Sequence, residues 1–379
     1  MADIPLSLYL HFPWCVKKCP YCDFNSHAQR GDVPEAAYVD ALLRDLDFEL
    51  HEPETRPLVS IFMGGGTPSL FSGAAITRVL DGVRQRLTFA AGIEITLEAN
   101  PGTADAENFA GYRKAGVNRL SIGVQSLNAT HLKALGRIHG PDEARGAMQL
   151  ARDAGFDNIN LDLMYALPQQ TPAEAEADVR ALCALAPEHI SFYHLTLEPN
   201  TEFHARPPPL PDEDAAWTMQ ERGQAILAEH GYAQYEVSAY AKPGHRSQHN
   251  LNYWQFGDYL GIGTGAHGKR SHGGSIVRRA RQKHPKSYLE TAGASACLQE
   301  NKSVPASDLP VEYAMNALRL NEGFNLDDFT QRTGLPVSVL ELPLAKAQQR
   351  GLIERTARHV RPSARGRTYL NELTGLFLP

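Results

Sequence analysis

Three of the chain's five cysteines, Cys15, Cys19 and Cys22, lie within one short segment of the sequence. Thiolates at this spacing are typical of a metal site that holds either zinc or an iron–sulfur cluster. A structural zinc ion needs four protein ligands, so His11 or His27 would have to complete the set. A four-iron cluster held by three cysteines instead leaves one iron open for a substrate. The spacing alone does not separate these two, although scattered free thiols explain so dense a group poorly.

A glycine-rich segment, "FMGGGTPS" (Phe62–Ser69), follows the next predicted strand. Because Gly64, Gly65 and Gly66 lack a Cβ atom, their backbone can approach a ligand closely. A lone run of three glycines also fits an ordinary turn, so this signal is specific only beside the cysteine segment. Together the two segments predict a ligand site next to a metal centre.

Polar side chains end three later strands of the predicted sheet. Glu98 ends "ITLEANP", Gln125 ends "LSIGVQS", and Asp162 lies in "NINLDLMYALP". Acids and amides in otherwise apolar strands are costly to bury unless a partner satisfies them. A structural hydrogen bond would explain any one of them alone, but three on successive strands at one edge predict ligand contacts. Arg137 in "LGRIHG" adds a cation suited to a carboxylate, unless it is a solvated arginine at a helix end.

These residues must be positioned by the strands and helices that alternate along the first two-thirds of the chain. Such alternation predicts a parallel sheet with right-handed crossovers and a site at the carboxyl ends of the strands. Periodicity does not decide between a doubly wound sheet and an incomplete barrel. Thr103 and Gly116 are expected to bound one helix, and Pro141 and Gly155 another. The six predicted strands are Leu6–Leu10, Leu58–Met63, Ile93–Leu97, Arg119–Val124, Asn158–Met164 and His189–Leu195.

The rest of the chain is expected to form a connecting region and a C-terminal module. A Pro-rich connection over 205–215 precedes a predicted helix over 212–230 and a predicted strand over 234–240. Residues 240–275, rich in Gly, His and aromatic side chains, have no clear period and are predicted to form a long ordered loop. Three helical patterns, a hairpin and a final helix then predict a winged-helix-like module. The predicted divisions are 1–240 for the α/β part, 241–300 for the connecting region and 301–379 for the helical module.

Composition places the chain among globular proteins of a reducing compartment. The formal net charge of −6 and the absence of a markedly basic helix give no indication of a nucleic-acid partner, so we expect the C-terminal module to serve packing. An odd, clustered set of cysteines argues against a secreted disulfide framework. The sequence shows neither a signal peptide nor an apolar run long enough to span a bilayer. We therefore expect a cytoplasmic protein.

The two ligand motifs resemble those of a known superfamily. Cys-x3-Cys-x2-Cys after the first strand, with Tyr21 just before the third cysteine, is similar to the cluster motif of the radical S-adenosylmethionine (SAM) superfamily, and the glycine segment arrives in register with its SAM motif. The segments "LYLHFPWC", "LEANP", "GVQS", "GRIH" and "DLMYALP" narrow the resemblance to the oxygen-independent coproporphyrinogen III oxidase group, over nearly the whole chain. The resemblance implies a partial (β/α)6 barrel, with a helical winged-helix-like module at its C-terminal end.

The resemblance also implies a set of ligand residues and two cofactors. A [4Fe-4S] cluster would be held by Cys15, Cys19 and Cys22, and SAM would chelate its open iron, where electron transfer could cleave it reductively. In the oxidases some of the matching SAM positions serve a second SAM, and the resemblance leaves open whether this chain cleaves SAM in normal work. The positions implied for SAM are Tyr9, Tyr21, Gly65, Gly66, Thr67, Glu98, Gln125, Arg137 and Asp162.

Two departures distinguish this chain from the oxidases. Phe24 stands where the oxidases carry a fourth cysteine, and only fourteen residues precede Cys15, where the oxidases carry a longer arm that helps to close the substrate site. These departures favour the haem chaperone relatives of the oxidase (the HemW type) over conversion of coproporphyrinogen III to protoporphyrinogen IX, which is the alternative. The motif His249-Asn250-x2-Tyr253-Trp254 and "HISFYHLTLEPNT" resemble the same chaperones.

The chaperone resemblance implies haem binding and delivery of haem to respiratory haem proteins. His249 is the implied haem ligand, because histidine commonly ligates haem iron, with the neighbouring aromatic side chains as a flat apolar surface. A structural network that closes the barrel would explain the same residues. The resemblance leaves a homodimer and transient contact with a membrane open, and it does not identify the protein that accepts haem.

Overall fold

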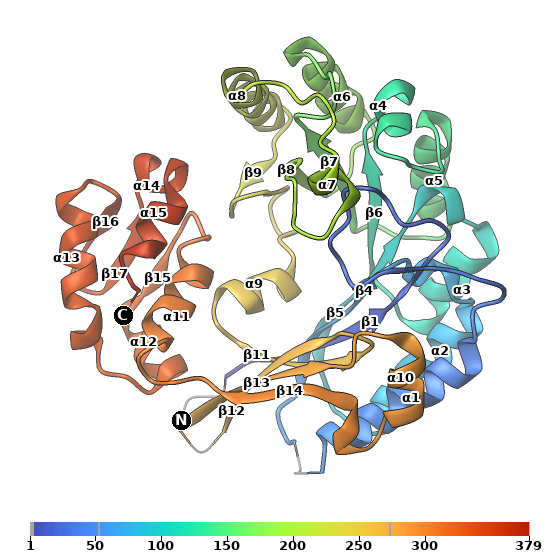
Figure 1. Ribbon diagram of the computed structural model, residues 1–379, viewed down its shortest axis with the longest axis horizontal. Coiled ribbons are helices and arrows are strands. Elements are labelled where there is room, and N and C mark those ends of the chain that lie inside the picture. Colours follow the sequence, from blue (N-terminus) through green and yellow to red (C-terminus); the bar gives the residue numbers. More distant parts are fainter. Residues whose placement is uncertain (1–3, 52–53, 273, 379) are drawn as a thin grey trace.

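Six strands of the N-terminal part pair in parallel and in chain order, as the sequence predicts. The computed structural model describes residues 4–51, 54–272 and 274–378. The strands form a curved sheet that leaves one side open, which makes a partial (β/α)6 barrel (Figure 1). The six strands are β1 (Leu6–Phe12), β4 (Leu58–Gly65), β5 (Phe89–Ala99), β6 (Arg119–Gln125), β7 (Ile159–Tyr165) and β8 (His189–His194).

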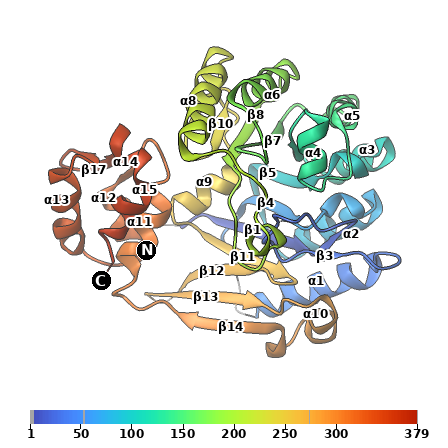
Figure 2. The same ribbon diagram turned by 45° about the horizontal axis from the view of Figure 1, so that its top comes forward.

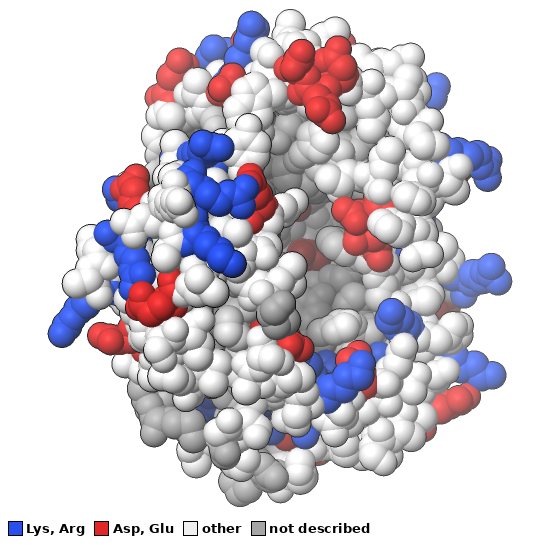
Figure 3. Space-filling view, turned by 60° about the vertical axis from the view of Figure 1, so that its left-hand side comes forward, with Lys and Arg blue, Asp and Glu red and all other residues white. Residues whose placement is uncertain are grey.

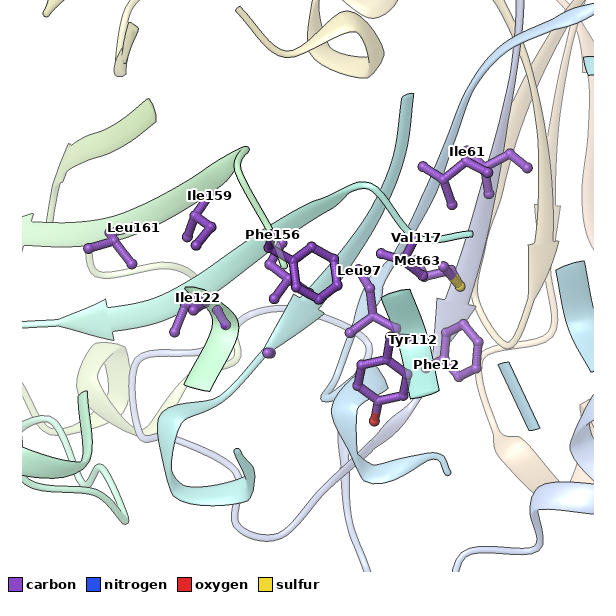
Figure 4. Close-up of a cluster of buried hydrophobic side chains, with 14 of the residues drawn as sticks. Phe12, Ile61, Met63, Leu97, Tyr112, Val117, Ile122, Phe156, Ile159 and Leu161 are labelled. Carbon is purple, nitrogen blue, oxygen red and sulfur yellow. The ribbon is translucent and has the colours of Figure 1, made fainter. Parts of the chain in front are cut away.

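Helices cover the outer face of this sheet (Figure 2). Alternate strand residues, among them Ile61, Leu97 and Leu161, point outward and pack under helices in a buried apolar cluster (Figure 4). The residues between them point into the barrel and include many polar side chains, so the strands alternate instead of being apolar on both faces. The covering helices are α1 (Glu35–Glu49), α2 (Gly73–Arg84), α3 (Ala106–Ala115), α5 (Pro141–Asp153), α6 (Pro172–Ala184) and α8 (Glu213–Glu229), with the short α4 (Ala129–Ala134) and α7 (Glu202–Ala205) near the strand ends.

The helix ends confirm most of the predicted boundaries and correct one. Gly116, with a φ of 109°, ends α3, and α5 begins at Pro141 and is followed by Gly155 with a φ of 86°. Thr103 does not cap α3, because it ends a short 3-10 turn. The cap is Asp105, whose carboxylate accepts a hydrogen bond from the backbone N–H of Asn108 at 3.0 Å.

The predicted loop over 240–275 is wrong, because most of it is regular structure. It contains α9 (Gln248–Trp254) and the strands β11 (Asp258–Gly263) and β12 (His267–His272), and β11 pairs in parallel with β1. Strands β13 (Ser275–Arg281) and β14 (Leu298–Ser303) continue the sheet beyond β12. The glycines that hide the strand pattern are required, since a Cβ atom on Gly261 would lie 1.9 Å from the carbonyl oxygen of His267.

The strand predicted over 234–240 is also corrected. It is a pair of short antiparallel strands, β9 (Ala233–Gln234) and β10 (Ala239–Ala241), and β10 pairs with the edge strand β8. The intervening residues turn the chain, and the N–H of Tyr235 donates to the carbonyl of Ala239. The prediction of one continuous strand is wrong because a short turn divides this segment.

The C-terminal module has the predicted helices and hairpin. Its small sheet combines β15 (Phe324–Asn325), β17 (His359–Pro362) and β16 (Ile353–Arg355). Its core also takes in Phe256 and Ile276, which lie outside the module in the sequence. Within the described residues, no helix combines the length and hydrophobicity needed to cross a bilayer. The helices are α11 (Leu309–Ala317), α12 (Leu326–Thr333), α13 (Glu341–Gln349), α14 (Ala364–Thr368) and α15 (Leu370–Gly375).

Candidate functional site

A cavity of about 320 Å³ lies at the carboxyl ends of the barrel strands. This is the position at which α/β barrels carry their ligand sites. The structure brings together all the residues predicted for the site except Tyr9 and His249. The predicted residues that line the cavity are Cys15, Cys19, Cys22, Tyr21, Gly65, Gly66, Thr67, Glu98, Gln125, Arg137 and Asp162.

The loop that carries the cysteines is held at both ends. Its base is closed by β2 (Trp14–Cys15), which pairs with β3 (His27–Ala28). Near its end, the backbone carbonyl of Asn25 accepts a hydrogen bond from Nε2 of His11 at 2.9 Å, and the Asn25 side chain donates to the carbonyl of Thr264 at 2.9 Å. The segment between these points, with all three sulfur atoms at the cavity, is thereby fixed on the ends of β1 and β11.

Three cysteine side chains at the cavity supply the number of thiolates that a four-iron cluster with one open iron needs. Within the described residues, no group of three or more His, Cys, Asp or Glu side chains is placed to hold one metal ion. In a four-iron cluster each cysteine binds a different iron atom, so the sulfur atoms need not converge on one point. Nη1 of Arg137 donates a hydrogen bond to Sγ of Cys19 at 3.7 Å. The side chains present therefore fit the cluster.

The glycine segment brings the end of β4 against β1. Gly65 has a φ of 111°, and a Cβ atom there would lie 2.4 Å from the ring of His11. A Cβ atom on Gly66 would lie 2.6 Å from the carbonyl oxygen of Trp14. The N–H groups of Gly66 and Thr67 donate to the carbonyls of Phe12 and Trp14. The glycines are therefore required by contacts within the chain, in addition to any approach to a ligand.

Two partly buried carboxyl groups at the cavity favour a cationic ligand. Burial, together with the nearby carboxylate of Asp162, raises the pKa of Glu98 to about 8, and burial also raises the pKa of Asp162. Within the described residues, neither group forms an ion pair. The N–H of Gly65 donates to Oε2 of Glu98 at 3.1 Å, which fixes its position. A ligand that carries positive charge, such as the ammonium and sulfonium groups of SAM, would complete this pair of acids.

Several cavity residues were not predicted from the sequence. The hydroxyl of Tyr193, on β8, donates to Oε1 of Gln125 at 2.7 Å and fixes the amide at the mouth. Ser121 and Gly123 line the cavity because they precede Gln125 at intervals of two on the same strand. This alternation was the signal available in the sequence, since every second residue of a barrel strand faces inward.

Tyr9 and His249 lie together on the inner face of the barrel, outside the cavity lining. The hydroxyl of Tyr9 bonds to Nδ1 of His11 at 3.0 Å. The His249 ring stacks on Phe62 with 4.9 Å between centroids, and its Nδ1 bonds to the Ser60 hydroxyl at 2.9 Å. His249 is 1% exposed, and burial lowers its pKa to about 3. Its imidazole is a neutral, enclosed group.

Comparison with known proteins agrees with this geometry. Residues 9–182 match the Radical SAM superfamily, and residues 304–369 match the HemN C-terminal domain. The chain is 51% identical to a protein of Escherichia coli (strain K12) named heme chaperone HemW, over 99% of this chain and 98% of the relative. It is 50% identical to the heme chaperone HemW of Haemophilus influenzae, with the same coverage of both chains.

A solved structure shows the same fold. The coproporphyrinogen III oxidase HemN from Escherichia coli, described as a radical SAM enzyme, superimposes with a TM-score of 0.82 at 24% sequence identity. The match covers 99% of this chain and 90% of HemN. With these relatives and the cysteine-lined cavity at the barrel mouth, the chain belongs to the HemW family of radical SAM proteins.

Proposed function

We propose that this protein is a haem chaperone that carries a [4Fe-4S] cluster, binds SAM, and delivers haem to respiratory haem proteins. The observation that carries this proposal is the 51% identity, over 99% of the chain, to a relative named heme chaperone HemW. The oxidase alternative is less well supported, because the likeness to HemN at 24% identity speaks for the fold and not for the reaction. Phe24, at the position of the oxidases' fourth cysteine, is 60% exposed at the cavity.

Each ligand is assigned to residues of the chain within this proposal. The cluster is bound by Cys15, Cys19 and Cys22, with Arg137 beside the sulfur of Cys19. When bound, the cluster supplies an electron donor and an open iron site for SAM. The residues proposed to hold SAM are Tyr9, Tyr21, Gly65, Gly66, Thr67, Glu98, Gln125, Arg137 and Asp162, of which all but Tyr9 line the cavity.

The chain's own residues prepare the cavity for a charged ligand. Glu98 and Asp162 supply two acceptors whose shared burial favours a cation, and Arg137 is placed to meet a carboxylate. The N–H of Gly65 and the hydroxyl of Tyr193 orient Glu98 and Gln125, respectively. Positive and negative groups of an amino-acid ligand would thus meet opposite charges at the mouth.

The proposal extends to the division of the chain into domains, to its partners and to its cellular location. The chain would divide into a radical SAM barrel over 1–240, a connecting region over 241–300 and a packing module over 301–379. We propose a cytoplasmic protein that takes no nucleic acid, with haem-accepting respiratory proteins as partners and with room for a homodimer or brief membrane contact. His249 remains the haem ligand suggested by the sequence, and because it is enclosed by Phe62 and Tyr253, haem could reach it only after α9 moved.

One anaerobic experiment separates the chaperone from the oxidase. The cluster-reconstituted protein would be titrated with haem and followed by visible absorption, and the same preparation would be assayed for coproporphyrinogen III turnover with SAM and a reductant. We expect saturable haem binding and no turnover. Turnover to protoporphyrinogen IX would overturn the proposal in favour of the oxidase, and a His249→Ala variant in the same titration tests the suggested ligand.

A further inference from the structure

Three large apolar side chains are exposed around the mouth of the cavity. Val16, Phe24 and Ile138 are 47%, 60% and 41% exposed, and all three line the cavity. Val16 and Phe24 come from the cysteine loop, and Ile138 comes from the segment between α4 and α5. Single exposed apolar residues are common on protein surfaces, but three that share one cavity mouth are typical of a binding surface. This group is called the apolar rim below.

Two lysines flank the apolar rim on the cysteine loop. Lys17 follows Val16 in the loop and lines the cavity. Its Nζ lies close to Gly136, at 4.0 Å from the position that a Cβ atom on this glycine would take. Nζ of Lys18 donates to the backbone carbonyl of Phe24 at 3.2 Å, so its charge is held at the Phe24 backbone. Asp23 offsets one of these two charges.

Acidic groups are concentrated elsewhere around the hollow. Glu98 and Asp162 lie deep in the cavity, and Glu198 also lines it, on the segment that follows β8. Figure 3 shows a hollow down one face of the molecule, with acidic side chains in and around it and basic side chains also at its edge. An amphiphile with negative groups on one edge would therefore be oriented with that edge toward the lysines of the cysteine loop.

We propose that haem binds at the mouth of this cavity, with its flat face on Val16, Phe24 and Ile138 and its propionates toward Lys17 and Lys18. This inference rests on the proposed chaperone function and names the surface that performs it. Haem has the matching chemistry, because it combines a large apolar plane with two carboxylates at one edge. The rim is open to solvent, so haem reaches it without the movement of α9 that His249 requires. Haem seated there covers the loop that carries the cluster cysteines.

A haem titration of the full-length, cluster-reconstituted protein tests the rim. Removing the Phe24 ring from the contact in a Phe24→Ser variant should weaken haem binding by about tenfold or more. The Lys17→Glu/Lys18→Glu double variant should weaken it by about fivefold, with a smaller effect at high salt. Leu342→Ser is the matched control, because Leu342 is 65% exposed on α13 and should leave haem affinity unchanged.

A second measurement reports where the haem sits. Haem at the mouth should slow the loss of cluster iron to a chelator, whereas haem ligated by His249 would leave that rate unchanged. If Phe24→Ser lowers the iron content of the protein, Ile138→Ser, on a separate loop, gives the same test without altering the cysteine loop.

The outcomes are distinguishable. Wild-type haem affinity in both Phe24→Ser and Ile138→Ser overturns the inference and leaves the chaperone function in place. The inference is also overturned if these variants lose binding to anionic phospholipid vesicles but keep haem binding, because the rim would then be a membrane contact. A wild-type protein that binds no haem overturns the proposed function itself.

Discussion

The two ends of the barrel interior are built from neighbouring residues of the same strands, yet they treat charge differently. At the mouth, Glu98 on β5 faces Asp162 on β7, and burial together with their mutual repulsion raises the pKa of Glu98 to about 8. At the closed end, Glu94 on the same β5 accepts hydrogen bonds from the N–H groups of Gln248 and His249 at the start of α9. Arg119 lies 3.9 Å from the same carboxylate.

Glu94 and Glu98 distinguish a structural contact from a ligand site. Buried polar groups occur at both ends, so polarity alone does not mark function. The charge of Glu94 is balanced by groups of its own chain, and Glu94 joins α9 to the sheet. Glu98 and Asp162 have no cationic partner among the described residues, so a ligand must supply the positive charge. We expect changes at the mouth to remove ligand binding and leave the fold intact. Changes at the closed end should lower stability and leave ligand binding intact.

The largest effect is expected from the cluster cysteines. Cys19→Ala should abolish cluster incorporation, because only two thiolates remain, while secondary structure is retained. Iron content and visible absorption after anaerobic reconstitution measure the loss. Cys183→Ala, which alters a buried cysteine of α6 outside the cavity, is the matched control and should retain the cluster. Full iron content in Cys19→Ala would show that the cavity is not the cluster site.

At the closed end, a change should act on stability and not on the cluster. Glu94→Ala leaves Arg119 buried without its partner and the N–H groups of Gln248 and His249 without their acceptor, so we expect unfolding to require about 3–5 kcal/mol less free energy. Denaturant unfolding measures the change. Glu229→Ala, at an exposed ion pair 3.7 Å from Arg180, should change stability by less than about 1 kcal/mol.

The contrast would fail if Glu94→Ala folded normally but lost iron. That result would place the closed end within the ligand site. We expect instead that the fraction of Glu94→Ala that remains folded takes up iron as the wild type does.

At the mouth, removal of a carboxyl group should raise stability instead of lowering it, and the gain should depend on pH. The pKa of Glu98 rises from 4.5 to about 8 on folding, so the protonated form is favoured in the fold and the wild type loses stability as pH rises through this range. A shift of this size corresponds to at most about 5 kcal/mol, and we expect Glu98→Gln to stabilise the ligand-free protein by about 2 kcal/mol at pH values near 8.

Unfolding of the ligand-free wild type and Glu98→Gln across pH measures this gain. Well below pH 4.5 the two proteins should have nearly equal stability, because Glu98 is then protonated in both the folded and the unfolded state. A gain that does not change with pH would mean that Glu98 carries no unpaired charge in the fold. The same variant should bind SAM more weakly, since an amide does not neutralise a cation.

The sequence predicted the mouth better than the closed end, for a physical reason. Cysteines, glycines and strand-end polar residues are local signals, and a parallel sheet necessarily gathers strand ends at one edge, so Glu98, Gln125 and Asp162 were predicted to lie together. Contacts such as Glu94 with α9 join residues over 150 positions apart and depend on tertiary packing. The sequence held no local sign that Glu94 caps a distant helix.

The same limit explains the errors in the connecting region. Gly261 and Gly263 interrupt the apolar pattern of β11, although the strand pairs with β1 along its length. Their positions are set by close contacts with β12 and with His11, which only the folded chain creates. Likewise the motif that begins at His249 resembled a ligand motif, and whether its enclosed imidazole ever meets haem is what the His249→Ala titration decides.

The smallest predicted effect concerns the contact between α9 and the C-terminal module. The guanidinium of Arg319 lies over the Trp254 ring at 4.3 Å and also pairs with Glu236 at 3.2 Å. A double-mutant cycle with Trp254→Leu and Arg319→Met should give a coupling free energy of about 1 kcal/mol, because this cation–π contact is largely shielded from water. The cycle cancels the separate cost of removing the ion pair with Glu236.

A more exposed contact of the same kind calibrates this cycle. Arg84 lies over the Phe89 ring at 5.4 Å and should couple by no more than about 0.5 kcal/mol. Equal coupling in the two cycles would mean that α9 does not transmit stability between the barrel and the C-terminal module. A larger coupling at Trp254 would establish the closed end as the joint of the two parts, so that any movement of α9 to expose His249 must also loosen the C-terminal module.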